Sequence, residues 1–214
     1  PKRQMLGEEQ EAWLQQALQR SKARGTTWQV LGQQVLMGKL NIPVIPPEEL
    51  AKLELSEYAR PRVEQTQQLA PYGLPSNLDA WDGYPAARER LFAMLSAHAT
   101  NPVSLAGDTH NGWAFNLTNQ KGEAVGVEWG TPGISSPGLE NYVPLPPEQM
   151  QALLKGASPE LVACDTSQRG WTHVTLTPEA ATAQWRFVSS VTEPTYRTSA
   201  GEPLVTQRNA RALV

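Results

Sequence analysis

Apolar residues recur at helical spacing in two long stretches of the chain. The first runs from Gly7 to Arg24 and is followed by Gly25, which suits the left-handed end of a helix. The second begins at Pro85, a residue favoured in the first helical turn, and reaches about Ala99. We predict a helix over each stretch. In the second helix the inner side is expected to carry Leu91, Phe92, Leu95 and His98, and the outer side Arg88, Glu89 and Arg90.

Shorter stretches follow the patterns of β-strands. Residues 28–37 are rich in β-formers and residues 103–106 form a short apolar run, so both are expected to be buried strands. Apolar and polar residues alternate on either side of a turn at residues 119–122, which predicts a hairpin. Strands are therefore expected at residues 28–37, 103–106, 113–118, 124–129, 161–165, 170–176 and 184–190. This order of helices and strands favours an α/β fold.

Two internal segments lack a sustained pattern. Prolines interrupt residues 41–75, for which we expect an excursion over the surface that holds a short helix near residues 48–58. Residues 130–147 are rich in Gly, Pro and Ser and are predicted to form a loop, with a short helix following over residues 148–155.

The chain has 214 residues, which is enough to bury a substantial core. We expect a main domain over residues 1–190. Because periodicity is weak beyond that point, residues 191–214 are expected to form a tail that wraps the surface or is mobile. The start at Pro1, without an initiator methionine, indicates part of a longer protein.

Composition argues against two classes of partner. The formal net charge is −3 and the basic residues form no stripe, so dedicated binding of a nucleic-acid duplex is not expected. No apolar run approaches the roughly 18 residues of a transmembrane helix, and no secretory signal opens the sequence. The single cysteine, Cys164, lies in an apolar run and is expected to be a buried thiol.

A carboxylate and an imidazole follow the predicted strand at residues 103–106. Loops beyond the carboxyl ends of strands build ligand sites in α/β sheets, so Asp108 and His110 are expected at such an edge. Gly107 would permit a tight backbone path that lets the two side chains converge as metal ligands. The alternative is a simple turn with a solvated carboxylate.

Five segments, spread in order over most of the chain, form a recognisable set. They are Met5–Leu14, Gln33–Met37, Trp81–Pro85, Gly107–His110 with Trp113 and Ala114, and Arg169–Trp171. Together they resemble the carboxyl-terminal half of PhoD-type alkaline phosphatases.

This resemblance implies the layered αββα sandwich of metallophosphoesterases, of which the chain is the carboxyl-terminal half. It also implies hydrolysis of phosphomonoesters and phosphodiesters by a metal-activated water. If the roles in the family's Gly-Asp-x-His motif apply here, Asp108 is expected to bind metal, and His110 to bind metal or face the phosphate. The family is associated with calcium and iron; carboxylate oxygen suits calcium, and imidazole suits iron or zinc. Arg169 is the local candidate for an arginine that offsets charge on the phosphoryl group.

The resemblance further implies what this sequence lacks. The family's earlier motifs supply other carboxylates, a cysteine and tyrosine on iron, and an asparagine near the phosphate. They have no counterpart here, and Cys164 lies too late in the chain to replace the cysteine. The missing amino-terminal half is therefore expected upstream or on another chain. Family members are typically exported by a twin-arginine signal, which implies a periplasmic or secreted protein.

Other interpretations remain open. The chain could be a non-catalytic binding or structural module, a split or degenerate phosphatase half that exposes a sheet edge to a partner. Arg169 could form an ion pair at the start of a strand instead of binding phosphate. The remaining alternatives are that His98 and His173 lie on element faces without binding metal, that Asp82 orders a loop, and that Trp81 and Tyr84 serve packing or contact the substrate.

Overall fold

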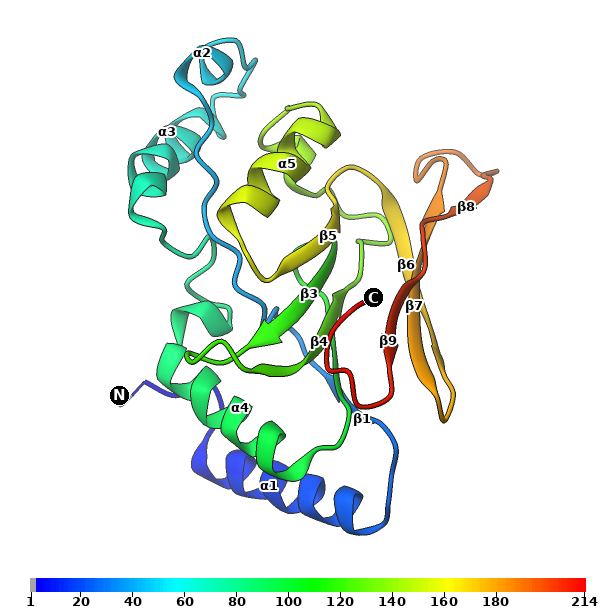
Figure 1. Cartoon of the computed structure of the whole chain (residues 1–214). Helices are drawn as coiled ribbons and strands as arrows, with labels where there is room; N and C mark the ends of the chain where they lie inside the picture. Colours follow the sequence, from blue (N-terminus) through cyan, green and yellow to red (C-terminus); the bar gives the residue numbers. More distant parts are fainter. Residues whose placement is uncertain (1–2) are drawn as a thin grey trace.

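The computed structural model describes residues 3–214 and has a mixed α/β architecture. Helices cover one face of a central sheet, and a second, smaller sheet covers the other face (Figure 1). The longer helices are α1 (Glu8–Ala23), α3 (Arg60–Leu69), α4 (Pro85–His98) and α5 (Pro147–Ala157), and α2 (Pro47–Leu50) is a single turn. Single 3-10 turns lie at Ala70–Tyr72, Trp81–Gly83 and Leu139–Asn141.

The central sheet has five strands in the order β1-β2-β4-β3-β5. Strands β1, β2 and β4 are parallel, whereas β3 pairs antiparallel with both β4 and β5. The parallel connection from β1 to β2 passes through α4, as the predicted crossover requires. The strands are β1 (Gln29–Gly32), β2 (Pro102–Ala106), β3 (Gly112–Thr118), β4 (Ala124–Gly130) and β5 (Leu161–Asp165).

The second sheet is antiparallel and contains the end of the chain. Strand β7 (Ala180–Val188) pairs with β6 (Arg169–Leu176), β8 (Thr198–Ala200) and β9 (Leu204–Gln207). Residues after Val191, for which no regular structure was expected, thus supply two strands. Their β pattern is short and mostly exposed, and pairing with β7 stabilises it. Whether residues 191–214 are a unit separate from residues 1–190 stays a prediction.

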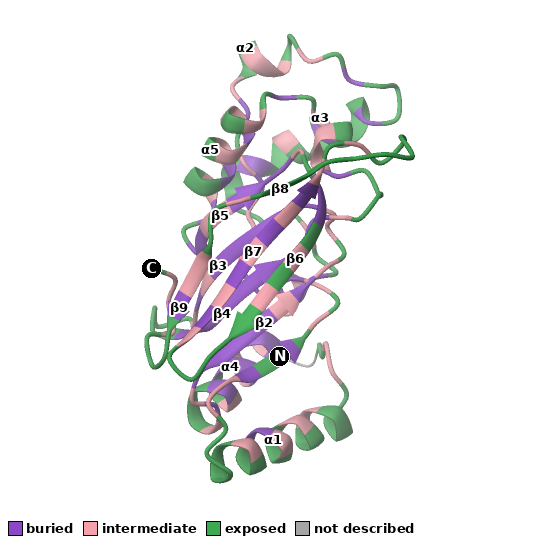
Figure 2. Cartoon of the chain, turned by 90° about the vertical axis from the view of Figure 1, so that its right-hand side faces the viewer, coloured by how far each residue is buried: buried purple, intermediate pink, exposed green. Residues whose placement is uncertain are grey.

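The central sheet is buried on both faces, so its strands carry two cores. Trp113, Phe115 and Leu117 of β3 pack toward the helices, together with Phe92 of α4 and Leu154 of α5. The opposite face packs against the second sheet through Val103, Ala114, Val127, Trp129, Ala181, Ala183, Trp185 and Phe187. In Figure 2 no helix lies over the outer face of the second sheet. The helix-sheet-sheet order is consistent with three of four sandwich layers, and the complete αββα sandwich stays a prediction.

Two elements differ from the sequence prediction. The strand expected over residues 28–37 ends at Gly32, because the following backbone leaves the sheet and bonds to side chains described below. Helix α3 falls in the segment expected to be irregular. Its Pro61 lies in the first helical turn, where the missing N–H costs no hydrogen bond, so the proline does not break the helix. Within residues 3–214, no helix is long and apolar enough to cross a membrane.

Candidate metal and phosphate site

The candidate site lies at the carboxyl edge of the parallel strands. Loops leave the ends of β1, β2 and β4 side by side, and two bonds join them: Gly107 N–H donates to the Gln34 carbonyl at 3.1 Å, and Thr131 N–H to the Ala106 carbonyl at 2.9 Å. Asp108 and His110 lie in the middle loop of the three, as the sequence predicts. An α/β sheet offers its ligand site at this edge.

Asp108 and His110 both present a free ligand atom. The Asp108 carboxylate is exposed and has no hydrogen-bonding partner among residues 3–214. The His110 Nδ1 lies 2.8 Å from the Pro137 carbonyl oxygen. Because a carbonyl only accepts, Nδ1 donates this bond, and Nε2 is the ring nitrogen left to face a ligand. A backbone carbonyl on the far nitrogen is a common second partner of metal-bound histidine.

Asp108 and His110 themselves make the tight backbone path, and Gly107 does not. Asp108 and His110 have φ angles of +70° and +62°, a left-handed conformation that is uncommon for residues other than glycine. Gly107 is not left-handed, and a methyl group there would meet only ordinary contacts at 3.9 Å. Strained residues persist where surrounding structure holds them, and they cluster at functional sites. The expected role of Gly107 was therefore wrong.

Arg169 holds this strained loop from behind. Arg169 is 8% exposed, and its guanidinium donates to the His110 carbonyl and pairs with Glu140 at 2.6 Å. Gly133 N–H donates to the same His110 carbonyl at 2.9 Å. The guanidinium thus lies in an ion pair near the start of β6, the alternative left open by the sequence. A direct contact between Arg169 and phosphate stays a prediction that this arrangement does not favour.

The loop after β4 packs closely against the same network. A methyl group on Gly138 would lie 2.5 Å from Asn111 Nδ2 and 2.8 Å from an Arg169 nitrogen, so a larger residue there would displace these side chains. The buried Asn111 side chain accepts from Leu139 N–H at 2.9 Å, while its Nδ2 finds no acceptor within residues 3–214. The site therefore retains one unused buried donor beside the candidate ligands.

Side chains also fix the backbone that follows β1. Five consecutive N–H groups, from residues 37 to 41, each donate to a side chain of another element. The pairs are Met37 and Gly38 with Glu128, Lys39 with Glu160, Leu40 with Asp82, and Asn41 with Ser158, at 2.8 to 3.0 Å. Asp82 thus orders a loop beside the site, which confirms the interpretation from sequence. Burial raises the pKa of Asp82, and the bond from Leu40 N–H partly opposes this.

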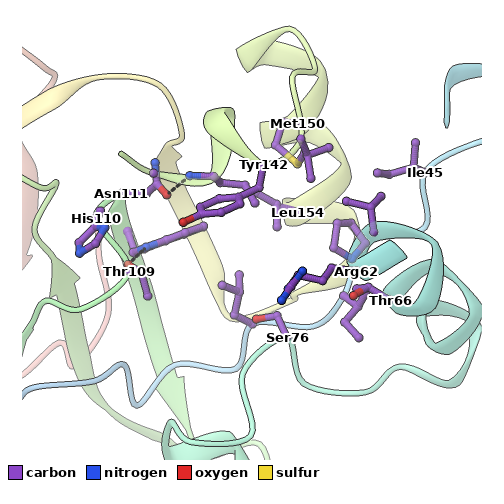
Figure 3. Close-up of a pocket in the computed structure, with 18 of the residues that line it drawn as sticks. Ile45, Arg62, Thr66, Ser76, Thr109, His110, Asn111, Tyr142, Met150 and Leu154 are labelled. Carbon is purple, nitrogen blue, oxygen red and sulfur yellow. Dashed lines mark hydrogen bonds between the residues drawn. The ribbon is translucent and has the colours of Figure 1, made fainter. Parts of the chain in front are cut away.

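A pocket of about 500 Å³ opens next to the Asp108–His110 loop. Figure 3 shows Thr109, His110 and Asn111 at one end of it and Arg62 and Thr66, from α3, at the other. Asp108 also lines the pocket. The segment around α3, together with α5, therefore builds a wall that the sequence patterns did not reveal.

Comparison with known proteins identifies the family. The sequence matches the PhoD-like phosphatase family over residues 1–185. The chain belongs to this family. It is 30% identical, over 218 residues, to alkaline phosphatase D of Bacillus subtilis (strain 168), and the match covers 100% of this chain and 32% of that protein. A solved structure of PhoD is similar in fold, with a TM-score of 0.69 and 26% identity over 100% of this chain and 35% of that one.

The family expected from the five sequence segments is therefore confirmed. The PhoD-like chain spans about one third of the length of both relatives. Within residues 3–214, no group of three or more His, Cys, Asp and Glu side chains is arranged to hold a metal ion. Asp108 and His110 fit a metal site as two of its ligands, and they do not complete one.

The other candidates from the sequence do not line the pocket of this PhoD-like site. His98 is half-buried at the end of α4, and His173 lies on the exposed face of β6. Cys164 is buried, and burial raises the pKa of its thiol to about 12. Trp81 is 2% exposed in the helical core and serves packing, while Tyr84 is half-buried against Arg3.

Replacing Arg169 is expected to weaken activity by releasing the His110 loop. We expect Arg169→Met to lower kcat/KM of the full-length protein by roughly tenfold to a hundredfold, since misplacement by about 1 Å has such effects. Glu140→Gln should also lower kcat/KM, because Glu140 orients Arg169 through their ion pair. This effect requires no contact between Glu140 and phosphate. Normal activity in Glu140→Gln, with strong loss in Arg169→Met, would instead support direct phosphate binding by Arg169.

Asp82 is expected to give stability a measurable pH dependence. Its pKa is raised in the folded state, so the folded protein holds this proton more tightly than the unfolded chain does. The stabilisation that the protonated Asp82 gives to the fold is present below its ordinary pKa of 3.8. It is lost as the pH rises through the raised pKa of the folded state. In denaturant titrations, the free energy of unfolding of the wild type, relative to that of Asp82→Asn, should therefore fall as the pH rises through this range. Asp79→Asn, an exposed change in the same loop, should leave the pH profile as in the wild type.

Proposed function

We propose that this chain is the carboxyl-terminal part of a metal-dependent hydrolase of phosphomonoesters and phosphodiesters. The supporting observation is the Asp108–His110 loop at the carboxyl edge of the sheet. One carboxylate and one imidazole Nε2 are free there, and the backbone is held in a left-handed conformation that presents them. Membership of the PhoD-like family supports phosphoester chemistry.

Asp108 and His110 are the residues of this chain that would hold the metal. Carboxylate oxygen suits calcium, and a neutral imidazole suits iron, so calcium and iron are the proposed ions. When bound, such ions lower the pKa of water and polarise phosphoryl oxygens. His110 also has the alternative role of facing the phosphate, since its Nε2 can hydrogen-bond to a phosphoryl oxygen.

Two ligands are too few for a binuclear site, so the remaining ligands are proposed to come from outside this chain's length. The relatives are about three times as long as this chain, which leaves room for them. The proposed partner is the missing amino-terminal half, whether on the same polypeptide or on a separate one. A periplasmic or secreted location is part of the same proposal and rests on the family resemblance.

The proposal is tested on the full-length protein, with bis(p-nitrophenyl) phosphate and p-nitrophenyl phosphate at alkaline pH. We expect hydrolysis of at least one ester, loss of activity on chelation and recovery on adding back calcium or iron. His110→Ala should lower the rate while retaining part of the metal found by elemental analysis. Undiminished hydrolysis across a chelator titration would contradict the metal mechanism.

A non-catalytic module is the second candidate, and one observation favours it. Strand β1 forms an edge of the central sheet, with Val30 43% exposed, and β6 exposes Trp171 by 38%. Such an edge and face suit a partner chain. The two candidates differ in outcome, because a module would bind its partner without any metal-dependent esterase activity in the complex.

A further inference from the structure

The pocket beside Asp108 and His110 has an uneven distribution of polar groups. One polar end is formed by the Asp108–His110 loop, where Thr109 and Asn111 lie (Figure 3). Asp108 belongs to the same lining. Apart from Arg62, Thr66, Gln67 and Ser76 on the far side, the rest of its lining is mostly apolar. The apolar residues include Ile42, Ile45, Val63, Leu139, Met150 and Leu154.

Two residues of the lining bring a formal charge, Asp108 at the loop and Arg62 on the α3 side. Asp108 is the one carboxylate among the lining residues, and it lies at the loop end. Arg62 lines the α3 side, but its guanidinium stacks on the Tyr58 ring at 3.8 Å and donates to the Tyr58 carbonyl at 2.8 Å. With the proposed metals at the loop, a ligand would place its anionic group there and an uncharged apolar group against the aliphatic wall.

We propose that this pocket binds the alcohol group of the ester, and that the preferred substrates are phosphoesters of aryl or medium-length alkyl alcohols. The inference rests on the proposed function and adds the substrate class. A volume of about 500 Å³ is within the range of small-molecule sites, which bury most of an apolar ligand. A small polar alcohol would leave the aliphatic wall in contact with water and gain nothing from it.

The test compares methylphosphonate and hexylphosphonate as inhibitors of bis(p-nitrophenyl) phosphate hydrolysis by the metal-loaded full-length protein. Both carry the same anionic group, and they differ by five methylenes. Each fully buried methylene strengthens binding by roughly fourfold. Allowing for the open mouth of the pocket, we expect the inhibition constant of hexylphosphonate to be lower by at least about tenfold.

Thr66→Trp places a large side chain in the pocket from an exposed position on α3, and Gln65→Trp places the same side chain one residue away, outside the pocket. Thr66→Trp should reduce the preference for hexylphosphonate to near one, whereas Gln65→Trp should keep it. Equal inhibition by both phosphonates in an active wild-type enzyme would overturn the inference and leave the proposed function intact. A preference that survives in Thr66→Trp would also overturn it, and absence of any phosphoesterase activity would overturn the proposed function itself.

Discussion

Asp108→Asn in the full-length protein should lose at least about a hundredfold in kcat/KM while keeping its fold. Replacing residues that only support a metal ligand already costs about tenfold to a hundredfold, so removing the charge of Asp108, a proposed ligand, should cost no less. The fold should survive because the Asp108 side chain is exposed and has no partner among residues 3–214. Asparagine also tolerates the left-handed backbone that Asp108 adopts.

Three measurements check this prediction: steady-state hydrolysis, metal content by elemental analysis, and unfolding in denaturant. We expect reduced metal content and a change in stability within about 0.5 kcal/mol of zero for the metal-free protein. Asp79→Asn makes the same chemical change at an exposed position outside the pocket and should keep full activity. Unchanged turnover and metal content in Asp108→Asn would refute the role given to Asp108.

Of the variants named, Arg88→Met should lower the free energy of unfolding the most, by about 3–5 kcal/mol. A loss of this size is typical of breaking a buried ion pair. Arg88 is 2% exposed, although the helical pattern predicted an outer position, so that expectation was wrong. Its guanidinium bonds to the Met37 carbonyl at 2.7 Å, the Thr118 carbonyl at 3.1 Å and Glu160 at 2.7 Å. Removing it leaves the buried Glu160 charge without its partner.

Arg90→Met provides a matched control on the same helix. Arg90 pairs with Glu11 at 2.8 Å, nearly the same distance, but its side chain is 38% exposed. Exposed pairs contribute about 0–1 kcal/mol, so this variant should unfold at nearly the wild-type denaturant concentration. Equal losses in the two variants would show that burial of Arg88 does not set its contribution. Because Glu160 also holds Lys39 N–H, Arg88→Met should additionally loosen the wall beside the site.

The main features of the site could be predicted from residues close together in the sequence. An apolar run followed by Asp108 and His110 placed both at a strand's carboxyl end, and the sheet confirms that position. The hairpin of β3 and β4 and the helices α1 and α4 followed from their periodicity in the same way. Such patterns succeed because burial on one face imposes a fixed spacing on apolar residues.

The pattern failed where polar groups pair across long distances. Arg88 looks like a surface residue until Glu160, 72 positions later, is seen to lie 2.7 Å from it. The strand expected through Met37 ends at Gly32, and the N–H groups of Met37 and of the following Gly38 bond to the distant Glu128 carboxylate instead of a neighbouring strand. A backbone donor only needs a partner, and the sequence does not state which one it will find.

By itself, the sequence determined the family, the order of most helices and strands, and the position of one carboxylate and one imidazole in a strand-end loop. The tertiary structure alone decided that Arg169 turns toward Glu140 and the His110 carbonyl, and that α3 and α5 enclose an apolar pocket beside that loop. Local spacing specifies which face of an element is buried. Contacts between segments far apart in the chain depend on how those faces pack, and so they appear only in the folded molecule.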